Sequence, residues 1–470
     1  MSDQSGGTAT TATAETQPRP APDPKRWKTL ALLGIAQFML IVDVTVVAIA
    51  LPHMGADLDL GREQITWVVS AYTLAFGGLM VLGGRVADLW GARRVVLAGL
   101  LVFTAASLVT GVANSAEVLL AGRVAQGLGA AMLSPAALSV VVQIFEGDER
   151  NKALGVWAAL GGVGAAVGVL LGGLLTAGPG WPWVFYVNVP VGVAVGVLLS
   201  RFLPPMARSS VRRGLDVPGA VLVTGATGVA IYALIGAGDR GWGSGTTLSL
   251  LATAVVLYVL FGVWQRVART PLMNLSLLFR RPVTAGTFLV LVATALMVAV
   301  FFLGTFYLQH HARYGALVTG LLFLPIALAT MAGANTAGRF IGRFGARLLA
   351  VVGLGVSAVG LAVPALVAGP VAMVVGVSVG ATGIGALFVV ASATALGQVD
   401  PGEAGVASGI VSTFHEFGAS LGAAVISSVA AASLTGGTTS GFTAGFTTAA
   451  LVAVAAGFLA LVLVPGRSSS

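Results

Sequence analysis

The strongest constraint on this chain is a succession of apolar segments, each long enough to cross a lipid bilayer. A membrane-spanning helix needs about 20 mostly apolar residues. Because 57% of the 470 residues are hydrophobic and only 9% are charged, a water-soluble fold of this length could not bury so much apolar surface. We therefore predict an all-α polytopic membrane protein. Its 14 spans are expected at 29–51, 66–83, 95–113, 117–144, 153–176, 183–203, 217–237, 247–265, 284–308, 316–338, 348–368, 370–396, 405–432 and 443–464.

The basic residues indicate how these spans are oriented. Loops that stay in the cytoplasm carry an excess of Lys and Arg, and with the N-terminus inside, 21 of the 25 Lys and Arg fall on the cytoplasmic side. Arg62, Arg240 and Arg313 fall outside, and Arg123 falls within a span. Both termini are therefore expected in the cytoplasm. Because the basic residues are spread over short loops, the net charge of +8 does not indicate binding to nucleic acid.

A short internal repeat indicates how the spans are grouped. The stretch "GGRVADLWGARR" at 83–94 has an echo in "AGRFIGRFGARL" at 337–348, eight spans later. Since a duplicated six-span unit would place the copies six spans apart, two extra spans are expected in the centre, at 217–237 and 247–265. The predicted division is a disordered cytoplasmic tail, an N-terminal six-helix bundle, linkers with the two extra helices, a C-terminal six-helix bundle and a short cytoplasmic tail, at 1–27, 28–205, 206–282, 283–465 and 466–470.

Several classes of chemistry are excluded by residues that the sequence lacks. There is no cysteine, and the four histidines include no pair at i, i+4, so no metal site is expected. None of the three lysines follows a glycine, which excludes a phosphate-binding loop and ATP hydrolysis in this chain. Clusters of catalytic His, Cys or paired acids are also missing, so an enzyme is a distant alternative. An ion gradient is the expected energy source; carboxyls within the spans favour protons, and sodium stays open.

Ionisable residues within apolar segments are the clearest functional signal. A charge near the middle of the bilayer costs roughly 2.5–3.5 kcal/mol on insertion scales, so such residues usually face a partner or a cavity. Asp43 in the first span and Glu416 in the thirteenth are candidate proton-binding sites, with Asp43 favoured. Glu416 shares a helical stripe with small polar residues that is expected to point inward. Arg123 is interpreted equally well as a structural partner or as a proton-coupling residue.

Three motifs carry a family resemblance. "GGRVADLWGARRV" from residue 83, "LLAGRVAQGLGAA" at 119–131 and "VDVTVVAIALP" at 42–52 together resemble the major facilitator superfamily, specifically its fourteen-span drug/proton antiporter branch, over residues 28–465. Two positions depart from that branch. Val169 follows Gly168 where the branch has proline, and Pro182 stands between two tryptophans where the branch has arginine.

The resemblance implies roles for further residues. It implies two six-helix bundles of the major facilitator fold and a conformational latch in the basic loop, formed by Gly84, Arg85, Asp88, Gly91, Arg93 and Arg94. It also implies a central substrate cavity, for which the candidates are Gln126, Phe301, Phe302, Phe306, Tyr307 and Phe388; ordinary core packing is the alternative for the phenylalanines. A third set, Gly164, Gly168 and Gly172, has the four-residue spacing of a close helix-packing face.

The expected function is secondary active export of drugs or of lipophilic and amphiphilic metabolites, in exchange for protons and by alternating access. The alternative is proton-linked or facilitative uptake of a small nutrient by the same fold. No cofactor is expected. The expected partners are the substrate, protons and the lipid bilayer, and the chain is expected to act as a monomer. Because the sequence has 22 arginines but 3 lysines, we expect a bacterium with a GC-rich genome and a place in its plasma membrane.

Overall fold

The computed structural model describes residues 25–145, 147–203, 214–272, 275–397, 404–431 and 440–466. Over these residues the chain is helical, without a strand, as predicted. The helices are α1 (Arg26–Asp57), α2 (Arg62–Trp90), α3 (Ala92–Gly111), α4 (Ala116–Ile144), α5 (Gly147–Ala177), α6 (Trp183–Tyr186), α7 (Asn188–Phe202), α8 (Val217–Arg240), α9 (Gly245–Val267), α10 (Leu275–Leu278), α11 (Arg281–Phe306), the π-helical turn η1 (Tyr307–His311), α12 (Ala316–Phe344), α13 (Ala346–Leu366), α14 (Pro370–Leu396), α15 (Ala404–Val429) and α17 (Ser440–Leu463).

Thirteen helical segments among the described residues are long and apolar enough to cross a membrane. In α5 the apolar part that qualifies is shorter, Val163–Ala177. The all-α membrane architecture is therefore confirmed, while the count of fourteen and the cytoplasmic termini stay predictions. The two predicted tails lie almost entirely outside the described residues. Residues 26 and 27, which we assigned to the N-terminal tail, already belong to α1.

The internal repeat corresponds to a repeated joint between helices. Gly91 ends α2 and precedes α3, and Gly345 ends α12 and precedes α13. Both glycines have positive φ, 94° and 81°, which a residue with a side chain adopts only at a cost. The two copies of the motif therefore place the same sharp turn at the same end of two helix pairs.

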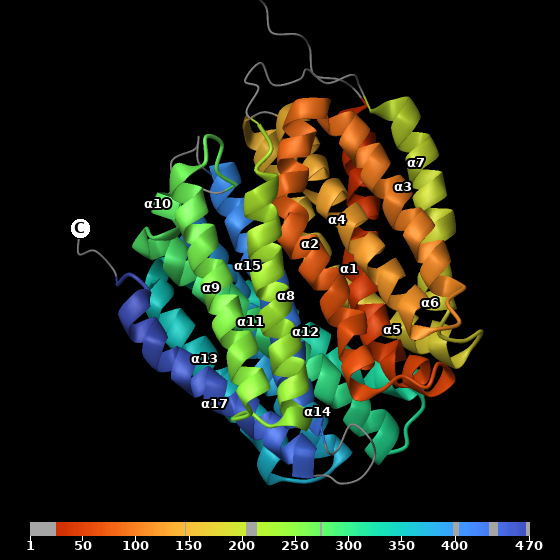
Figure 1. Ribbon diagram of the computed structural model, residues 1–470, viewed down its shortest axis with the longest axis vertical. Coiled ribbons are helices and arrows are strands. Elements are labelled where there is room, and N and C mark those ends of the chain that lie inside the picture. Colours follow the sequence, from red (N-terminus) through yellow and green to blue (C-terminus); the bar gives the residue numbers. More distant parts are fainter. Residues whose placement is uncertain are drawn as a thin grey trace, which may run out of the picture.

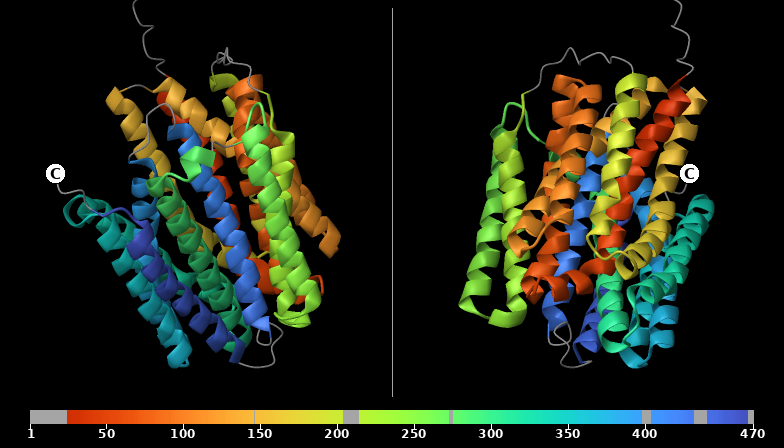
Figure 2. Two further views of the ribbon diagram at one scale, coloured as in Figure 1. Left: turned by 60° about the vertical axis from the view of Figure 1, so that its left-hand side comes forward. Right: turned by 90° about the vertical axis from the view of Figure 1, so that its right-hand side faces the viewer.

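The helices run side by side in two groups with a hairpin beside them (Figures 1 and 2). We call α1–α7 the N half and α11–α17 the C half; α8 and α9 form the hairpin. The end of the molecule that carries the repeated basic loops is called the inner end, and the opposite end is the outer end. In Figure 1 the inner end, where α1 begins, is at the top.

Two large apolar cores show where the halves join. One core belongs to the N half alone and includes Leu33, Phe103 and Leu199. The other runs through the C half and continues into the outer part of the N half, where Met54 and Phe185 belong to it. The halves therefore share a continuous core at their outer ends.

Glycines allow the helices to approach closely, which matters because apolar burial provides no driving force between helices in lipid. Gly164, Gly168 and Gly172 all lie on the face of α5 that meets α1, where an added Cβ would press against residues of that helix. On the next face of α5, Gly173 meets the start of α12, and Gly320 of α12 lies against the Val169 carbonyl. These glycines thus join α5 to its own half and to the other half.

Candidate functional site

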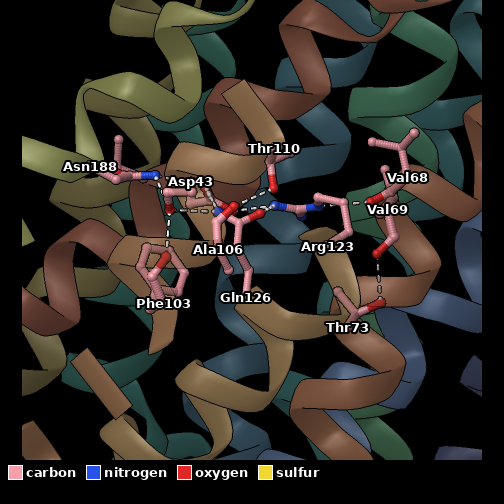
Figure 3. Close-up of polar contacts among 12 residues, drawn as sticks. Asp43, Val68, Val69, Thr73, Phe103, Ala106, Thr110, Arg123, Gln126 and Asn188 are labelled. Carbon is pink, nitrogen blue, oxygen red and sulfur yellow. Dashed lines mark hydrogen bonds and ion pairs between the residues drawn. The ribbon is translucent and has the colours of Figure 1, made fainter. Parts of the chain in front are cut away.

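The two charges predicted within spans form an ion pair inside the N half. Asp43 lies in the middle of α1 and Arg123 lies in the first third of α4. The Arg123 Nη1 atom donates to Asp43 Oδ2 at 2.6 Å, and the two side chains are 0–1% exposed (Figure 3). Each charge therefore has a counterion in a place that water does not reach, which offsets part of the cost of burying both.

Further polar groups hold this pair from three other helices (Figure 3). Asp43 Oδ1 accepts hydrogen bonds from Asn188 Nδ2 at 3.0 Å and from Gln126 Nε2 at 3.2 Å. Gln126 Nε2 also donates to Ser107 Oγ at 2.9 Å, and Arg123 Nε donates to the Val68 carbonyl at 2.9 Å. Hydrogen-bond donors therefore reach both carboxylate oxygens of Asp43.

Sequence reasoning missed two members of this cluster, Asn188 and Ser107. Asn188 begins α7 and is 2% exposed, and Ser107 of α3 is fully buried. The sequence signal for Asn188 was that it is the single amide side chain in the apolar segment 183–203. This signal is weak, because one polar residue in a span can have many different roles. Gln126, which we expected to line a substrate cavity, is fully buried against Asp43 instead.

Tyr72 of α2 covers the guanidinium group. Its ring centroid lies 4.3 Å from Arg123 Cζ, in cation–π geometry. Its hydroxyl is buried and has no hydrogen-bond partner among the described residues. The next residue, Thr73, contacts Ser420 of α15 at 2.5 Å. Helix α2 therefore contacts the buried ion pair through Val68 and Tyr72 and the C half through Thr73.

The contacts between α2 and α15 continue as a line of buried polar groups, which we call the α2–α15 seam. At its inner limit, Glu416 lies against Gly77, where an added Cβ would press on the Glu416 Cβ. Toward the outer end, Thr66 contacts Ser427 at 2.5 Å. The seam consists of Arg62, Thr66, Thr73 and Gly77 on α2 and Glu416, Ser420 and Ser427 on α15.

Glu416 thus faces the N half, in agreement with the predicted inward direction of its stripe. It is 8% exposed, and within the described part of the chain it forms no ion pair. His415 points elsewhere: its Nδ1 lies 3.0 Å from Thr294 Oγ1, and its ring packs on Phe388 with centroids 5.6 Å apart. Asp43 and Glu416 therefore occupy separate polar groups, and α2 contacts both groups.

Most of the aromatic residues expected to line a cavity pack inside the C half. Phe302 and Phe306 are 2% and 0% exposed and lie 5.1 Å apart. Phe301 stacks on Phe323 at 5.1 Å, and Tyr307 packs on Phe442 at 5.5 Å. In this conformation the positions of these four residues match the alternative of core packing. The sequence could not separate the two roles, because an aromatic residue in an apolar span has the same local sequence whether it lines a cavity or packs in a core. Phe388 is partly buried.

The basic loop lies at the inner surface. Asp88 is 52% exposed at its side chain, and its ion-pair partner among the described residues is Arg85 of the same helix, at 4.0 Å. Arg93 donates to the Ser200 carbonyl at 2.7 Å and so binds the C-terminal end of α7. The other residues of the predicted latch, Gly84, Gly91 and Arg94, lie near the joint between α2 and α3. The role of the loop as a conformational latch stays a prediction.

Comparison with known proteins identifies relatives over most of the chain. The model of the Major Facilitator Superfamily matches residues 33–423. The puromycin resistance protein of Streptomyces alboniger is 38% identical, covering 85% of this chain and 81% of that protein. The cephamycin export protein of Amycolatopsis lactamdurans is 37% identical over 84% of this chain and 82% of the relative. The multidrug resistance protein Stp of Mycobacterium tuberculosis is 34% identical over 84% of this chain and 74% of that protein.

Solved structures agree on the fold. A peptide transporter POT in complex with sulfate matches with a TM-score of 0.65 at 17% identity, covering 93% of this chain and 94% of that chain. A bacterial homologue of the human lysosomal transporter Spinster, in an inward-facing and occupied conformation, matches with a TM-score of 0.65 at 16% identity over 94% and 97% of the two chains. With its many apolar helices and its bacterial relatives, this chain is a multi-pass protein of a bacterial plasma membrane. It belongs to the major facilitator superfamily.

Proposed function

We propose that this protein exports drugs or lipophilic and amphiphilic small molecules from the cell in exchange for protons. The names of its relatives include resistance to puromycin, export of cephamycin and multidrug resistance, and these relatives cover most of the chain. The proton gradient supplies the energy, and the protein acts as a transporter without a cofactor. Uptake of a nutrient is the alternative, and these relatives favour export.

The observation that carries the proposal is the ion pair between Asp43 and Arg123. A carboxylate that is fully buried, paired with a guanidinium group and bound by two amides can take up a proton only if these contacts rearrange. Protonation of Asp43 then removes the counterion of Arg123 and leaves a buried charge, so α1 and α4 are driven to a new arrangement. A protonation event is in this way converted into a movement of helices.

Transport by alternating access requires the two halves to separate at one end at a time. Here the halves join at the outer end, through the shared core and through contacts such as that of Gly320 with Val169. We propose that this conformation receives substrate from the inner side. Glu416 is positioned to exchange a proton in the next step of the cycle, because its carboxyl group in the α2–α15 seam is exposed when the seam opens.

The test uses proteoliposomes with an acidic interior and a labelled substrate such as puromycin or ethidium outside. An antiporter accumulates the substrate as protons leave, whereas a proton-linked importer requires the opposite gradient. Asp43→Asn should lose this accumulation while it keeps exchange of substrate down its own gradient, because an amide has no proton to exchange in this pH range. The matched control is Asp59→Asn, the same change at an exposed residue outside the helices.

The outcomes separate the possibilities. Accumulation by Asp43→Asn equal to that of the wild type would move the coupling site to Glu416, and Glu416→Gln tests this directly. Accumulation only when the exterior is acidic would support uptake and refute export. Accumulation driven by a sodium gradient without a pH gradient would replace the proton as the coupling ion.

A further inference from the structure

The hairpin of α8 and α9 lies where the two halves meet. Helix α8 packs against α2 of the N half and α15 of the C half, and it runs along the boundary between them in Figure 1. Helix α9 packs mainly on α8 and stands at the side of the molecule, as the right-hand view of Figure 2 shows. During alternating access the halves move apart, so α8 has to follow one half and slide against the other.

The buried apolar contacts of the hairpin belong to the C half. One cluster joins Val223 of α8 and Phe261 of α9 to Ile410 and Phe417 of α15, and a smaller cluster joins Ile231 and Ile235 of α8 to Ala424 of α15. The α2 residues around these clusters are only partly buried. The backbones also approach closely, because an added Cβ at Gly238 would lie 2.8 Å from the Ser428 carbonyl oxygen.

At the inner end, Asp216 fastens the hairpin to the segment that leads into the C half. Its carboxylate accepts hydrogen bonds from Trp264 Nε1 at 2.7 Å and Gln265 Nε2 at 2.6 Å of α9, and from the backbone N–H groups of Gly219 at 2.8 Å and Leu272 at 2.9 Å. Leu272 belongs to the same cluster as Val283 of α11. The start of α8, the end of α9 and the chain entering the C half therefore meet at one carboxylate.

Helix α8 also packs on α2, where an added Cβ at Gly78 would press on the Thr224 side chain of α8. At the outer end the link between the hairpin and the N half is polar. Arg62 at the outer end of α2 forms an ion pair with Asp239 of α8 and donates to the Ile235 carbonyl at 2.9 Å. It also donates to Ser427 Oγ of α15 at 3.1 Å. The Arg62 side chain is 5% exposed, but that of Asp239 is 58% exposed. A pocket of about 880 Å³ beside the pair is lined by both residues.

We propose that the hairpin moves with the C half and that Arg62 is the releasable link that closes the outer end. Arg62 binds α8 and α15, and both helices move away from Arg62 together if the hairpin follows the C half. Its ion pair with Asp239 borders the surface, so water can replace that contact when the outer end opens. The packing of α8 on α15 is apolar and interlocked, so its separation would leave helix surfaces unmatched. Asp239 and Ser427 position the Arg62 guanidinium in the closed state.

Spin labels measure this directly, because the chain has no cysteine and each label is introduced at a chosen cysteine. Exposed positions at the outer end are Val112 on the N half, Trp242 on the hairpin turn and Leu366 on the C half, 60%, 46% and 84% exposed. Distances between labels in the three pairs are compared in the otherwise wild-type protein and in Arg62→Ala, reconstituted in lipid. The matched control is Arg240→Ala, because Arg240 bonds the Tyr232 carbonyl of its own helix.

In Arg62→Ala the Val112–Leu366 and Val112–Trp242 pairs should both show a new longer distance, while the Trp242–Leu366 distance stays constant. Since hydrogen bonds to a charged group are among the stronger ones, the ratio of open to closed outer ends should rise about tenfold. Asp239→Asn should produce a smaller shift in the same direction, because Arg62 keeps its bonds to Ile235 and Ser427.

Opposite results would overturn the proposal in distinct ways. If the Val112–Leu366 distance is unchanged in Arg62→Ala, Arg62 is not the link that closes the outer end. If that distance lengthens while Val112–Trp242 stays constant, the hairpin moves with the N half. The proposal rests on alternating access, which belongs to the proposed function. The distance measurements do not require transport, so their outcome is independent of the test of proton-driven export in vesicles.

Discussion

Removing either charge of the Asp43–Arg123 pair should destabilise the protein far more than removing both. Two unit charges about 4 Å apart attract by about 4 kcal/mol at an effective dielectric constant of about 20. Breaking a buried pair by removing one partner typically costs about 3–5 kcal/mol, because the other charge is left uncompensated. Here neither side chain is more than 1% exposed, so water cannot replace the lost partner without a rearrangement.

The local geometry makes each single change unfavourable for its own reason. Arg123→Met leaves the Asp43 carboxylate with the two amide donors of Gln126 and Asn188 but without a counterion. Asp43→Asn leaves the guanidinium with uncharged acceptors, the Val68 carbonyl and Gln126 Oε1. It also introduces an amide NH2 group where donors converge on both oxygens. The double variant carries neither buried charge and should recover at least about 2 kcal/mol of the summed cost.

The assay is a double-mutant cycle on purified protein in mixed micelles, with unfolding by a denaturing detergent followed through tryptophan fluorescence. The control cycle combines Asp59→Asn with Arg123→Met, since Asp59 is exposed and should contribute additively. If the Asp43 and Arg123 effects add to within about 0.5 kcal/mol, the two charges do not stabilise each other and the reasoning fails.

Three other changes test separate parts of the structure. Asn188→Leu removes one donor to Asp43 and should cost about 1.5–3 kcal/mol in the same unfolding assay, whereas a loss below about 0.5 kcal/mol would show that the bond to Asn188 is dispensable. Burial opposes ionisation of Asp216, but its hydrogen bonds from Trp264, Gln265 and two backbone N–H groups hold its pKa below the usual value for Asp. The stabilising contribution of Asp216 is therefore present above the ordinary pKa of about 3.9 and is lost as the pH falls through the lower folded value. Asp216→Ala should lower the thermal unfolding midpoint at pH 7, and acidification should then lower the midpoint of this variant less than that of the wild type. If the variant lowered the midpoint by the same amount at pH 7 and at pH 3, this reasoning would be contradicted. Asp88→Asn should slow turnover in proteoliposomes while expression and substrate binding stay normal; unchanged turnover would make Asp88 an ordinary loop residue.

The sequence alone determined the membrane class, the helical segments and the candidate charges. Hydropathy is a local property, because each span must be apolar over about 20 residues whatever its neighbours are. Asp43, Arg123 and Glu416 stand out for the same reason, since a charge within an apolar segment has few uses that do not involve a partner or a cavity. The repeated glycine joint was also visible, because Gly91 and Gly345 recur in matching motifs.

Only the tertiary structure decided which of these residues meet. Asp43 and Arg123 are 80 positions apart, and Asn188 lies a further 65 positions along the chain, so no local pattern links them. The aromatic residues of α11 illustrate the same limit, because Phe302 and Phe306 have identical sequence surroundings whether they face a cavity or a core. The attachment of α8 to the C half likewise depends on backbone contacts such as that of Gly238 with Ser428. In lipid, apolar residues cover every face of a helix, so hydropathy determines that a helix spans the bilayer but not which neighbour each face contacts.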